Sequence, residues 1–473
     1  MIKYTIKNKG ARNVEKRAER TDPVTEVRRW VIPGESRAYV LTFGCQQNEA
    51  DSERLLGLAL SMGYGRADTP EEAELILVNT CAIREHAELK ALSIIGGFKH
   101  VKEKNPRVII GVCGCMAAEP HRVEDLKRRY PYVTFTLEPA KIGSLPAIVA
   151  AAIRTKKRSF LLPDAPTVVP IIDEGLPVER LSRHKAWVSI MYGCNNYCTY
   201  CIVPYVRGRE RSRASGEVIC EIEGLAASGA REITLLGQNV NSYRSDCDFA
   251  GLVKRIGEIP GDFRLRFMTS HPKDVSDDLI ACFPDTPHLA PHFHLPLQSG
   301  SDRILARMNR HYDVPRYLSI VDRLRARDPE ITLTSDVIVG FPGETEEDFQ
   351  ATLDLLDRVR FDQVYSFIYS PRRGTPAAEY PDQIPPDVSR DRMRRLLDLQ
   401  CEISAEKNRP LVGKTLRVLC DGPSPDGTPG IVTGRTEGGK LVHFAAPEDT
   451  AGRFVSVKID RADAFALRGT LTE

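Results

Sequence analysis

The chain has 473 residues, of which 42% are hydrophobic and 27% are charged. This is the composition of an ordinary globular protein with room for about three domains. No run of about 18 apolar residues occurs, so neither a transmembrane helix nor a membrane partner is expected. The net charge of only +2 excludes a chain that is basic throughout, and any nucleic-acid surface must therefore be local.

Residues 1–35 form a basic head. Within it, residues 1–29 carry nine Lys or Arg side chains against four Asp or Glu. Almost no apolar periodicity is present, so we predict a disordered extension that serves as a solubilising tail or as an arm for RNA. The head lacks the apolar segment of a secretory signal, and twelve cysteines in such a chain favour a reducing, cytoplasmic location.

Strands alternate with helices over residues 36–153, which predicts a domain built on a parallel sheet. Each of its three clearest strands ends just before a cysteine, at Cys45, Cys81 and Cys115. The carboxyl ends of parallel strands share one sheet edge, so the three thiols can converge there. Each alone would be a packing cysteine, but together they favour an iron–sulfur site. Cys113 is assigned to the interior of the sheet.

Residues 154–185 are rich in proline and mixed charge, as expected for an extended linker. A second series of strands and helices occupies residues 186–410. Its six predicted strands are 187–191, 233–236, 265–268, 292–296, 333–339 and 363–369. Six strands are too few for a closed eight-stranded barrel, so we predict a partial (β/α)6 barrel with its chemistry at the carboxyl ends of the strands.

The first of these strands leads into the stretch Cys194–Cys201, where three cysteines follow the pattern C-x3-C-x2-C. Thiolates are soft ligands that bind iron–sulfur clusters or zinc. A zinc site usually adds a second pair of cysteines or histidines, and the nearest downstream histidine is His271. An iron–sulfur cluster is the preferred interpretation and zinc the alternative. Three thiolates would leave one iron of a cube open for another ligand.

Residues 411–473 contain short strands between Gly, Pro and Asp turns, which predicts a small β-barrel. Eight Lys or Arg residues balance eight Asp or Glu, so composition does not decide between an RNA-binding module and a structural cap. The chain is therefore assigned to the α/β class, with a parallel-sheet domain, a partial barrel and a terminal β-barrel.

Together these motifs resemble the methylthiotransferase family of radical S-adenosylmethionine (SAM) enzymes. The cysteine loop, with Tyr197 and Tyr200, is similar to the radical SAM signature, and the terminal barrel is similar to a TRAM domain. The stretches that carry the resemblance are Thr42–Asn48, Asn79–Glu85, Gly114–Ala117, Tyr192–Cys201, Leu235–Tyr243, His294–Asp302 and Gly340–Glu344. Within the family, the second and fifth stretches look like the branch that acts on N6-dimethylallyladenosine in tRNA. Gln47 departs from that pattern, which usually has methionine.

The resemblance implies methylthiolation of carbon 2 of N6-dimethylallyladenosine at position 37, next to the tRNA anticodon. It implies two SAM molecules, one as methyl donor and one as source of a 5′-deoxyadenosyl radical, and two [4Fe-4S] clusters. The ligands would be Cys194, Cys198 and Cys201 for the radical-generating cluster, and Cys45, Cys81 and Cys115 for an auxiliary cluster that carries sulfur. A reductant protein of the flavodoxin or ferredoxin type and a sulfur delivery system are implied as partners.

Contacts with SAM are expected at the strand ends. The candidates are Tyr200, Gly237, Gln238, Gln298, Ser299 and Asp336. A row of four arginines follows the cluster loop, namely Arg207, Arg209, Arg211 and Arg213. On a strand these side chains would face one way and could contact RNA phosphates. The alternatives are methylthiolation of N6-threonylcarbamoyladenosine, a two-cluster electron carrier, and a zinc-stabilised RNA-binding protein without catalysis.

Overall fold

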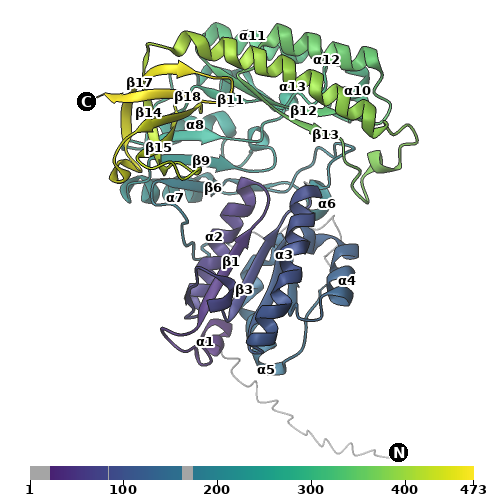
Figure 1. The fold of residues 1–473 in the computed structure, drawn as a ribbon, viewed down its shortest axis with the longest axis vertical. Coiled ribbons are helices and arrows are strands. Elements are labelled where there is room, and N and C mark those ends of the chain that lie inside the picture. The colour runs from purple at the N-terminus through teal and green to yellow at the C-terminus, as the bar shows by residue number, and fades with distance from the viewer. Residues whose placement is uncertain (1–21, 84, 162–173, 473) are drawn as a thin grey trace, which may run out of the picture.

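The computed structural model describes residues 22–83, 85–161 and 174–472. Three parts are visible in Figure 1: the N-terminal domain at one end, the larger core at the other, and the C-terminal barrel against the side of the core. Within the described residues, every helix is too short or too polar to span a bilayer. The predicted α/β architecture is confirmed, with corrections at the elements named below.

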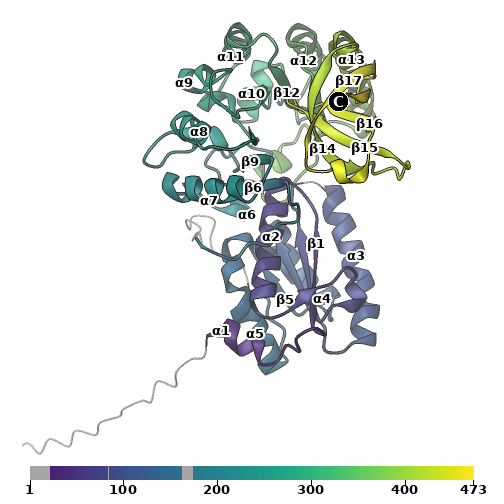
Figure 2. The ribbon, with the colours of Figure 1, turned by 90° about the vertical axis from the view of Figure 1, so that its left-hand side faces the viewer.

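The N-terminal domain is a parallel sheet covered by helices. In the described chain its strand order is β2-β1-β3-β4-β5. The strands are β1 (Arg37–Thr42), β2 (Gly65–Arg66), β3 (Leu75–Thr80), β4 (Ile109–Gly114) and β5 (Phe135–Leu137). The helices are α1 (Pro23–Arg28), α2 (Gln46–Ser61), α3 (Glu85–Lys104), α4 (Pro120–Arg129) and α5 (Leu145–Thr155). Apolar residues of α2 and α5 pack on one face of the sheet and those of α3 and α4 on the other (Figure 2).

The extension predicted over residues 1–35 is wrong in its last part. Asp22 caps α1 by accepting a hydrogen bond from the Thr25 N–H at 3.0 Å. Val27 is fully buried in the core of the domain, and α1 packs against α5. One buried residue in a short polar helix gives too little apolar periodicity for a sequence-based prediction. Residues 1–21 of the head and 162–173 of the linker lie outside the described residues.

The core has two sheets of three parallel strands in the part of the chain that the structure describes, β6-β9-β10 and β11-β12-β13, which confirms the partial barrel. The strands are β6 (Lys185–Ser189), β9 (Glu232–Leu236), β10 (Arg264–Phe267), β11 (His292–His294), β12 (Thr332–Val339) and β13 (Gln363–Ile368). Its helices are α6 (Val203–Arg207), α7 (Ser215–Ala227), α8 (Phe249–Gly257), α9 (Asp277–Ala281), α10 (Asp302–Arg307), α11 (Val314–Arg327), α12 (Glu346–Val359) and α13 (Pro386–Asn408). A short ribbon of β7 (Met191–Tyr192) and β8 (Arg211–Ser212) lies beside them.

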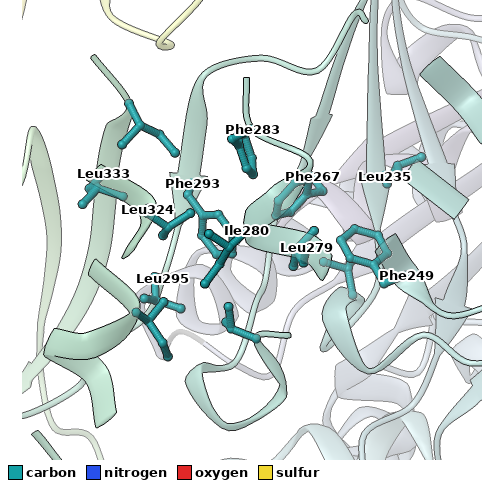
Figure 3. Packing of buried hydrophobic residues seen from close by; sticks show 14 of the residues in the cluster. Leu235, Phe249, Phe267, Leu279, Ile280, Phe283, Phe293, Leu295, Leu324 and Leu333 are labelled. Carbon is teal, nitrogen blue, oxygen red and sulfur yellow. The ribbon is translucent and has the colours of Figure 1, made fainter. Parts of the chain in front are cut away.

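Aromatic rings fill the space between these strands and their helices (Figure 3). The ring of Phe267 lies 5.1 Å from that of Phe249 and 5.3 Å from that of Phe293, edge to face in both cases. Each fully buried side chain of this kind stabilises the fold by about 1.5–3 kcal/mol through the apolar surface it removes from water. This packing fixes the positions of the strand ends that carry the site.

The C-terminal barrel is closed, with the order β14-β15-β16-β18-β17 among the described residues. Its strands are β14 (Thr415–Pro423), β15 (Ile431–Thr436), β16 (Leu441–Ala445), β17 (Phe454–Ala462) and β18 (Leu467–Thr472). Four strands are predicted in this part of the sequence, at 415–420, 430–433, 440–444 and 455–460, and β18 is missed because Arg, Gly and Thr separate its two leucines. Long-range pairing with β16 and β17 forms this strand and closes the barrel.

The turn between β15 and β16 enters the amino-terminal end of the partial barrel. Arg266 of β10 donates hydrogen bonds to the carbonyls of Thr436 and Glu437 at 2.9 and 2.8 Å. Lys440 pairs with the buried Asp362 at 2.8 Å. The C-terminal barrel is therefore fastened to the core by buried polar contacts.

We expect Phe267→Ala to lower the free energy of unfolding of the core by about 3–5 kcal/mol, because the truncation leaves a cavity between the Phe249 and Phe293 rings. Urea denaturation followed by Trp187 fluorescence in a Trp30→Phe background measures this. Ile368→Ala, a deletion at a partly exposed site on β13, should cost less than half as much. Equal losses in the two variants would contradict the packing described here.

Candidate functional site

The loop that contains Cys194, Cys198 and Cys201 is held from the side of α10. The Thr199 hydroxyl donates to the carbonyl of Arg307 at 3.0 Å. The Asn309 amide donates to two loop carbonyls at 3.2 and 3.0 Å. The end of α10 and the residues after it thus hold the main chain of the loop in place. The three thiols project from this fixed backbone.

Arg310 is a buried cation that contacts this loop. Its Nη1 donates to Cys198 Sγ at 3.2 Å and lies 3.3 Å from the Tyr200 hydroxyl. Burial raises the pKa of Cys194 to about 11, and the positive charge of Arg310 acts in the opposite direction. The sequence analysis missed Arg310, which lies 112 residues after Cys198 and belongs to no recognisable motif.

The second set of cysteines meets around Asn48, at the start of α2. Cys45 Sγ lies 3.7 Å and Cys115 Sγ 4.0 Å from Asn48 Oδ1. Cys81 approaches from the end of β3: a Cβ on Gly44, where φ is +117°, would lie 3.1 Å from Cys81 Sγ. Glycine is required there for both reasons. The structure therefore brings together the three thiols that were predicted at the strand ends.

Helix α6 connects the two cysteine sets. It begins two residues after Cys201, and it is only five residues, or about 7.5 Å, long. Ile202 and Val206 pack with Cys115 in one buried cluster. Figure 1 shows α6 where the N-terminal domain meets the core. Both sets of thiols therefore lie close to this junction.

The predicted strand of four exposed arginines is wrong. The chain forms α6 up to Arg207 and is extended only at Arg211–Ser212. Two of the arginines are buried and paired. Arg207 binds the buried Asp51 at 2.9 Å, and Arg213 binds the half-buried Glu221 at 2.7 Å. These carboxylates compensate charges that would otherwise be costly to bury. Arg209 and Arg211 are exposed beside the loop.

Arg207 also holds the residue on which the auxiliary thiols converge. Its Nη2 donates to Asn48 Oδ1 at 2.9 Å as well as to Asp51. Burial alone would lower the pKa of Arg207, but Cys115 and Asp51 beside it hold this pKa above its ordinary value. A permanent positive charge therefore lies next to the second cysteine set.

Four buried polar atoms at the carboxyl ends of β9 and β10 have no hydrogen-bond partner among the described residues. They are Gln238 Oε1, Asn239 Oδ1, Ser270 Oγ and His271 Nε2. Buried polar atoms are normally paired, so such a group marks a place for a polar ligand. Burial and nearby Arg310 lower the pKa of His271 far below its ordinary value, and its ring is neutral. The Gln238 and Asn239 oxygens are acceptors that suit the ammonium group of a ligand such as SAM. His271 Nδ1 accepts from the Lys273 N–H, so its Nε2 is a donor in the neutral ring.

The other predicted SAM contacts lie at the same end of the strands. The Gln298 N–H donates to the Asp336 carbonyl at 2.7 Å, and the Asp336 carboxylate lies 3.5 Å from His294 Nε2. Ser299 is fully buried and accepts a hydrogen bond from the Ser301 N–H at 3.2 Å. The Ser299 hydroxyl therefore stabilises the turn before α10.

Gly237 and Tyr200 are placed by packing. A Cβ on Gly237 would lie 2.4 Å from Met191 Cγ, so only glycine lets the end of β9 approach β7 this closely. The Tyr200 ring packs edge to face against Phe341 at 6.5 Å. Tyr200 and Gly237 therefore define the shape of the rim around the cysteine loop.

A cavity of about 730 Å³ lies where all three parts of the chain meet. Its wall includes Gln46, which follows Cys45, and Trp187 and Met268 of the core. Tyr365 of β13 and Phe465 of the C-terminal barrel also line it. Cavities of this size hold small organic ligands, and a nucleoside is within that range.

The thiol chemistry fits iron–sulfur clusters. As the side chains stand, no three His, Cys, Asp or Glu groups of the described residues are arranged to hold a metal ion. Burial raises the pKa of Cys115 to about 12, in keeping with the value at Cys194. Sulfur donors of this kind suit iron, which deprotonates the thiols that it binds.

Three family models match the chain. The model described as Radical SAM superfamily matches residues 188–356, Uncharacterized protein family UPF0004 matches 37–138, and TRAM domain matches 409–472. Among solved structures, the radical S-adenosylmethionine methyltransferase TsrM from Kitasatospora setae, with cobalamin and a [4Fe-4S] cluster, has a TM-score of 0.54 at 15% identity. The match covers 72% of this chain and 77% of that chain, and it shows a likeness of fold.

Curated relatives are similar along nearly the whole chain. Proteins named tRNA-2-methylthio-N(6)-dimethylallyladenosine synthase from Thermoanaerobacter sp. (strain X514) and Acetivibrio thermocellus are 47% and 45% identical to it, over 440 and 455 residues. The first alignment covers 92% of each chain, and the second covers 94% of this chain and 93% of the relative.

Replacing Arg207 by methionine should destabilise the protein by about 3–5 kcal/mol, because the Asp51 carboxylate is left buried without its partner. Adding Asp51→Asn should restore most of this loss, so the two substitutions should be strongly coupled. Urea denaturation of the four proteins of the cycle measures the coupling. Arg209→Met is the matched exposed control and should change stability little. An Arg207 variant as stable as the parent would contradict the proposed role of the ion pair.

Proposed function

The chain belongs to the family of radical SAM tRNA methylthiotransferases, and from this premise we propose that it places a methylthio group on carbon 2 of N6-dimethylallyladenosine at position 37 of tRNA. The observation that carries the proposal is the 47% identity to a synthase of that name over 92% of the chain. The junction at α6 supports it, because one short helix joins the two sets of cysteines.

We assign one [4Fe-4S] cluster to Cys194, Cys198 and Cys201 and a second to Cys45, Cys81 and Cys115. When bound, the first would supply the electron that splits one SAM into methionine and a 5′-deoxyadenosyl radical, while the second supplies sulfur and another SAM the methyl group. Three protein ligands for each cluster agree with this division of roles.

The protein's own groups bind and orient SAM. Arg310 is close enough to Tyr200 and Cys198 to attract the carboxylate of a SAM bound at the loop. The unpaired oxygens of Gln238 and Asn239 can accept hydrogen bonds from its ammonium group. Gln298 and Asp336 extend the same rim, so we propose that they contact the rest of SAM.

The tRNA anticodon loop would enter by the cavity between the three parts. The target adenosine must leave its stack to reach the cysteine loop, as in other enzymes that modify bases. Exposed Arg209 and Arg211 lie beside that loop, where phosphates would pass. We also propose a flavodoxin- or ferredoxin-like reductant, a sulfur delivery system and a reducing cytoplasm.

Anaerobic turnover with SAM, reductant and tRNA, followed by nucleoside mass spectrometry, tests the proposal. We expect one methylthio group on N6-dimethylallyladenosine. Cys194→Ala should abolish 5′-deoxyadenosine formation, whereas Cys81→Ala should keep SAM cleavage and lose thiolation. Each variant should hold about four irons in place of about eight. Cys113→Ala, which removes a buried thiol of β4 outside either set, should keep all the iron.

Three results would contradict the proposal. Thiolation of threonylcarbamoyladenosine alone would change the substrate assignment. Zinc in place of iron would favour an RNA-binding protein without catalysis. Normal SAM cleavage by Cys194→Ala would move the radical-generating cluster elsewhere.

Arg310→Gln should slow SAM cleavage by roughly ten- to a hundredfold, the usual effect of removing a group that supports a metal ligand. The reduction potential should also become more negative, because a positive charge and a hydrogen bond to Cys198 are lost. A redox titration followed by electron paramagnetic resonance measures the potential. Arg310→Lys keeps the charge and should shift it less. Slower cleavage at an unchanged potential would show that Arg310 acts on SAM and not on the cluster.

A further inference from the structure

Phe465 is the most exposed large hydrophobic side chain in the described part of the chain, with 77% of its surface accessible. It lies in the hairpin that joins β17 to β18, and it lines the cavity between the core and the C-terminal barrel. Tyr365 and Leu397 line the same cavity and are 40% and 48% exposed. A group of exposed apolar side chains at one opening indicates a binding surface.

The hairpin holds Phe465 in a fixed position. The Asp463 N–H donates to the Ala466 carbonyl at 2.9 Å and closes the turn. Asn408, buried at the end of α13, donates to the carbonyls of Asp463 and Ala464 at 2.8 and 3.2 Å. The backbone that carries the ring is therefore anchored to the core, which lowers the entropy lost when a ligand binds.

Basic side chains lie at the base of this hairpin. Arg461 and Arg468 face each other across β17 and β18, and His443 of β16 is the next neighbour of Arg468. Like charges placed opposite each other destabilise a sheet. Asp463 compensates Arg461, with a distance of 3.1 Å, whereas Arg468 has no ion-pair partner among the described residues. Such a row is suited to the phosphates of a polyanion.

We propose that Phe465 stacks on an unpaired base of the RNA loop, while the row of Arg461, Arg468 and His443 contacts its phosphates. Proteins that bind single-stranded RNA combine an aromatic platform with a basic track in this way. The inference rests on the proposed function only in taking RNA as the substrate. It adds a specific role for the C-terminal barrel, which is to hold a loop base at the mouth of the cavity.

Binding of a fluorescein-labelled anticodon stem-loop, measured by anisotropy, tests the stacking. Phe465→Ala should weaken binding of the stem-loop roughly tenfold or more. It should not change the affinity for a fully paired duplex with the same number of nucleotides. Phe465→Trp should restore the affinity, because the larger ring also stacks. Arg468→Gln should instead weaken both RNAs and reduce the dependence on log salt by about one unit.

SAM cleavage in the absence of RNA and the melting temperature should be the same for Phe465→Ala and the parent, since the side chain is exposed and belongs to neither cysteine set. Unchanged affinity for the stem-loop would overturn the inference, as would an equal loss for the duplex. A change in oligomeric state on size-exclusion chromatography would assign the surface to a second copy of the chain and would overturn it too. Stem-loop binding by the parent without thiolation would refute the proposed function alone.

Discussion

The site depends on the burial of positive charge beside groups that would otherwise stay neutral. Arg207 is the centre of this arrangement, because its guanidinium binds Asp51 and Asn48 of the N-terminal domain while its backbone belongs to α6 of the core. Arginine suits this place, since its planar group can make several directed hydrogen bonds and does not lose its proton. It joins the two halves of the site together with the packing of Ile202 and Val206 on Cys115.

The same solution occurs at the other cysteine set. Arg310 is buried against Cys198, and burial raises the pKa of Cys194 in this set and of Cys115 beside Arg207. A thiol in such surroundings stays protonated until a metal binds. The arginines reduce the cost of collecting thiolates at one place, and they do so without offering a competing ligand, because a guanidinium cannot coordinate iron. In both sites, therefore, a buried arginine lies beside the cysteine thiols.

The sequence was enough to predict which cysteines come together. It could not predict contacts between residues that are far apart along the chain. Strand periodicity and the rule that parallel strands end at one edge were enough to gather Cys45, Cys81 and Cys115. They could not place Arg207, whose partner Asn48 is 159 residues away. The alternating arginines looked like a strand because alternation is a local signal. The carboxylate that pairs with Arg207 is 156 residues away, and no local pattern indicates it. Arg213 pairs with Glu221, only eight residues along the chain but on the following helix.

The C-terminal barrel shows how such distant contacts connect recognition to chemistry. Lys440 binds Asp362 of the core and also the side chain of Asn408 at 2.8 Å. Asn408 in turn holds the hairpin that carries Phe465. One buried network thus fixes both the turn that closes the amino-terminal end of the partial barrel and the hairpin at the mouth of the cavity. Since a packed network of this kind resists deformation, the hairpin keeps a fixed position relative to the core. The barrel is therefore fastened to the core and is not a freely tethered module.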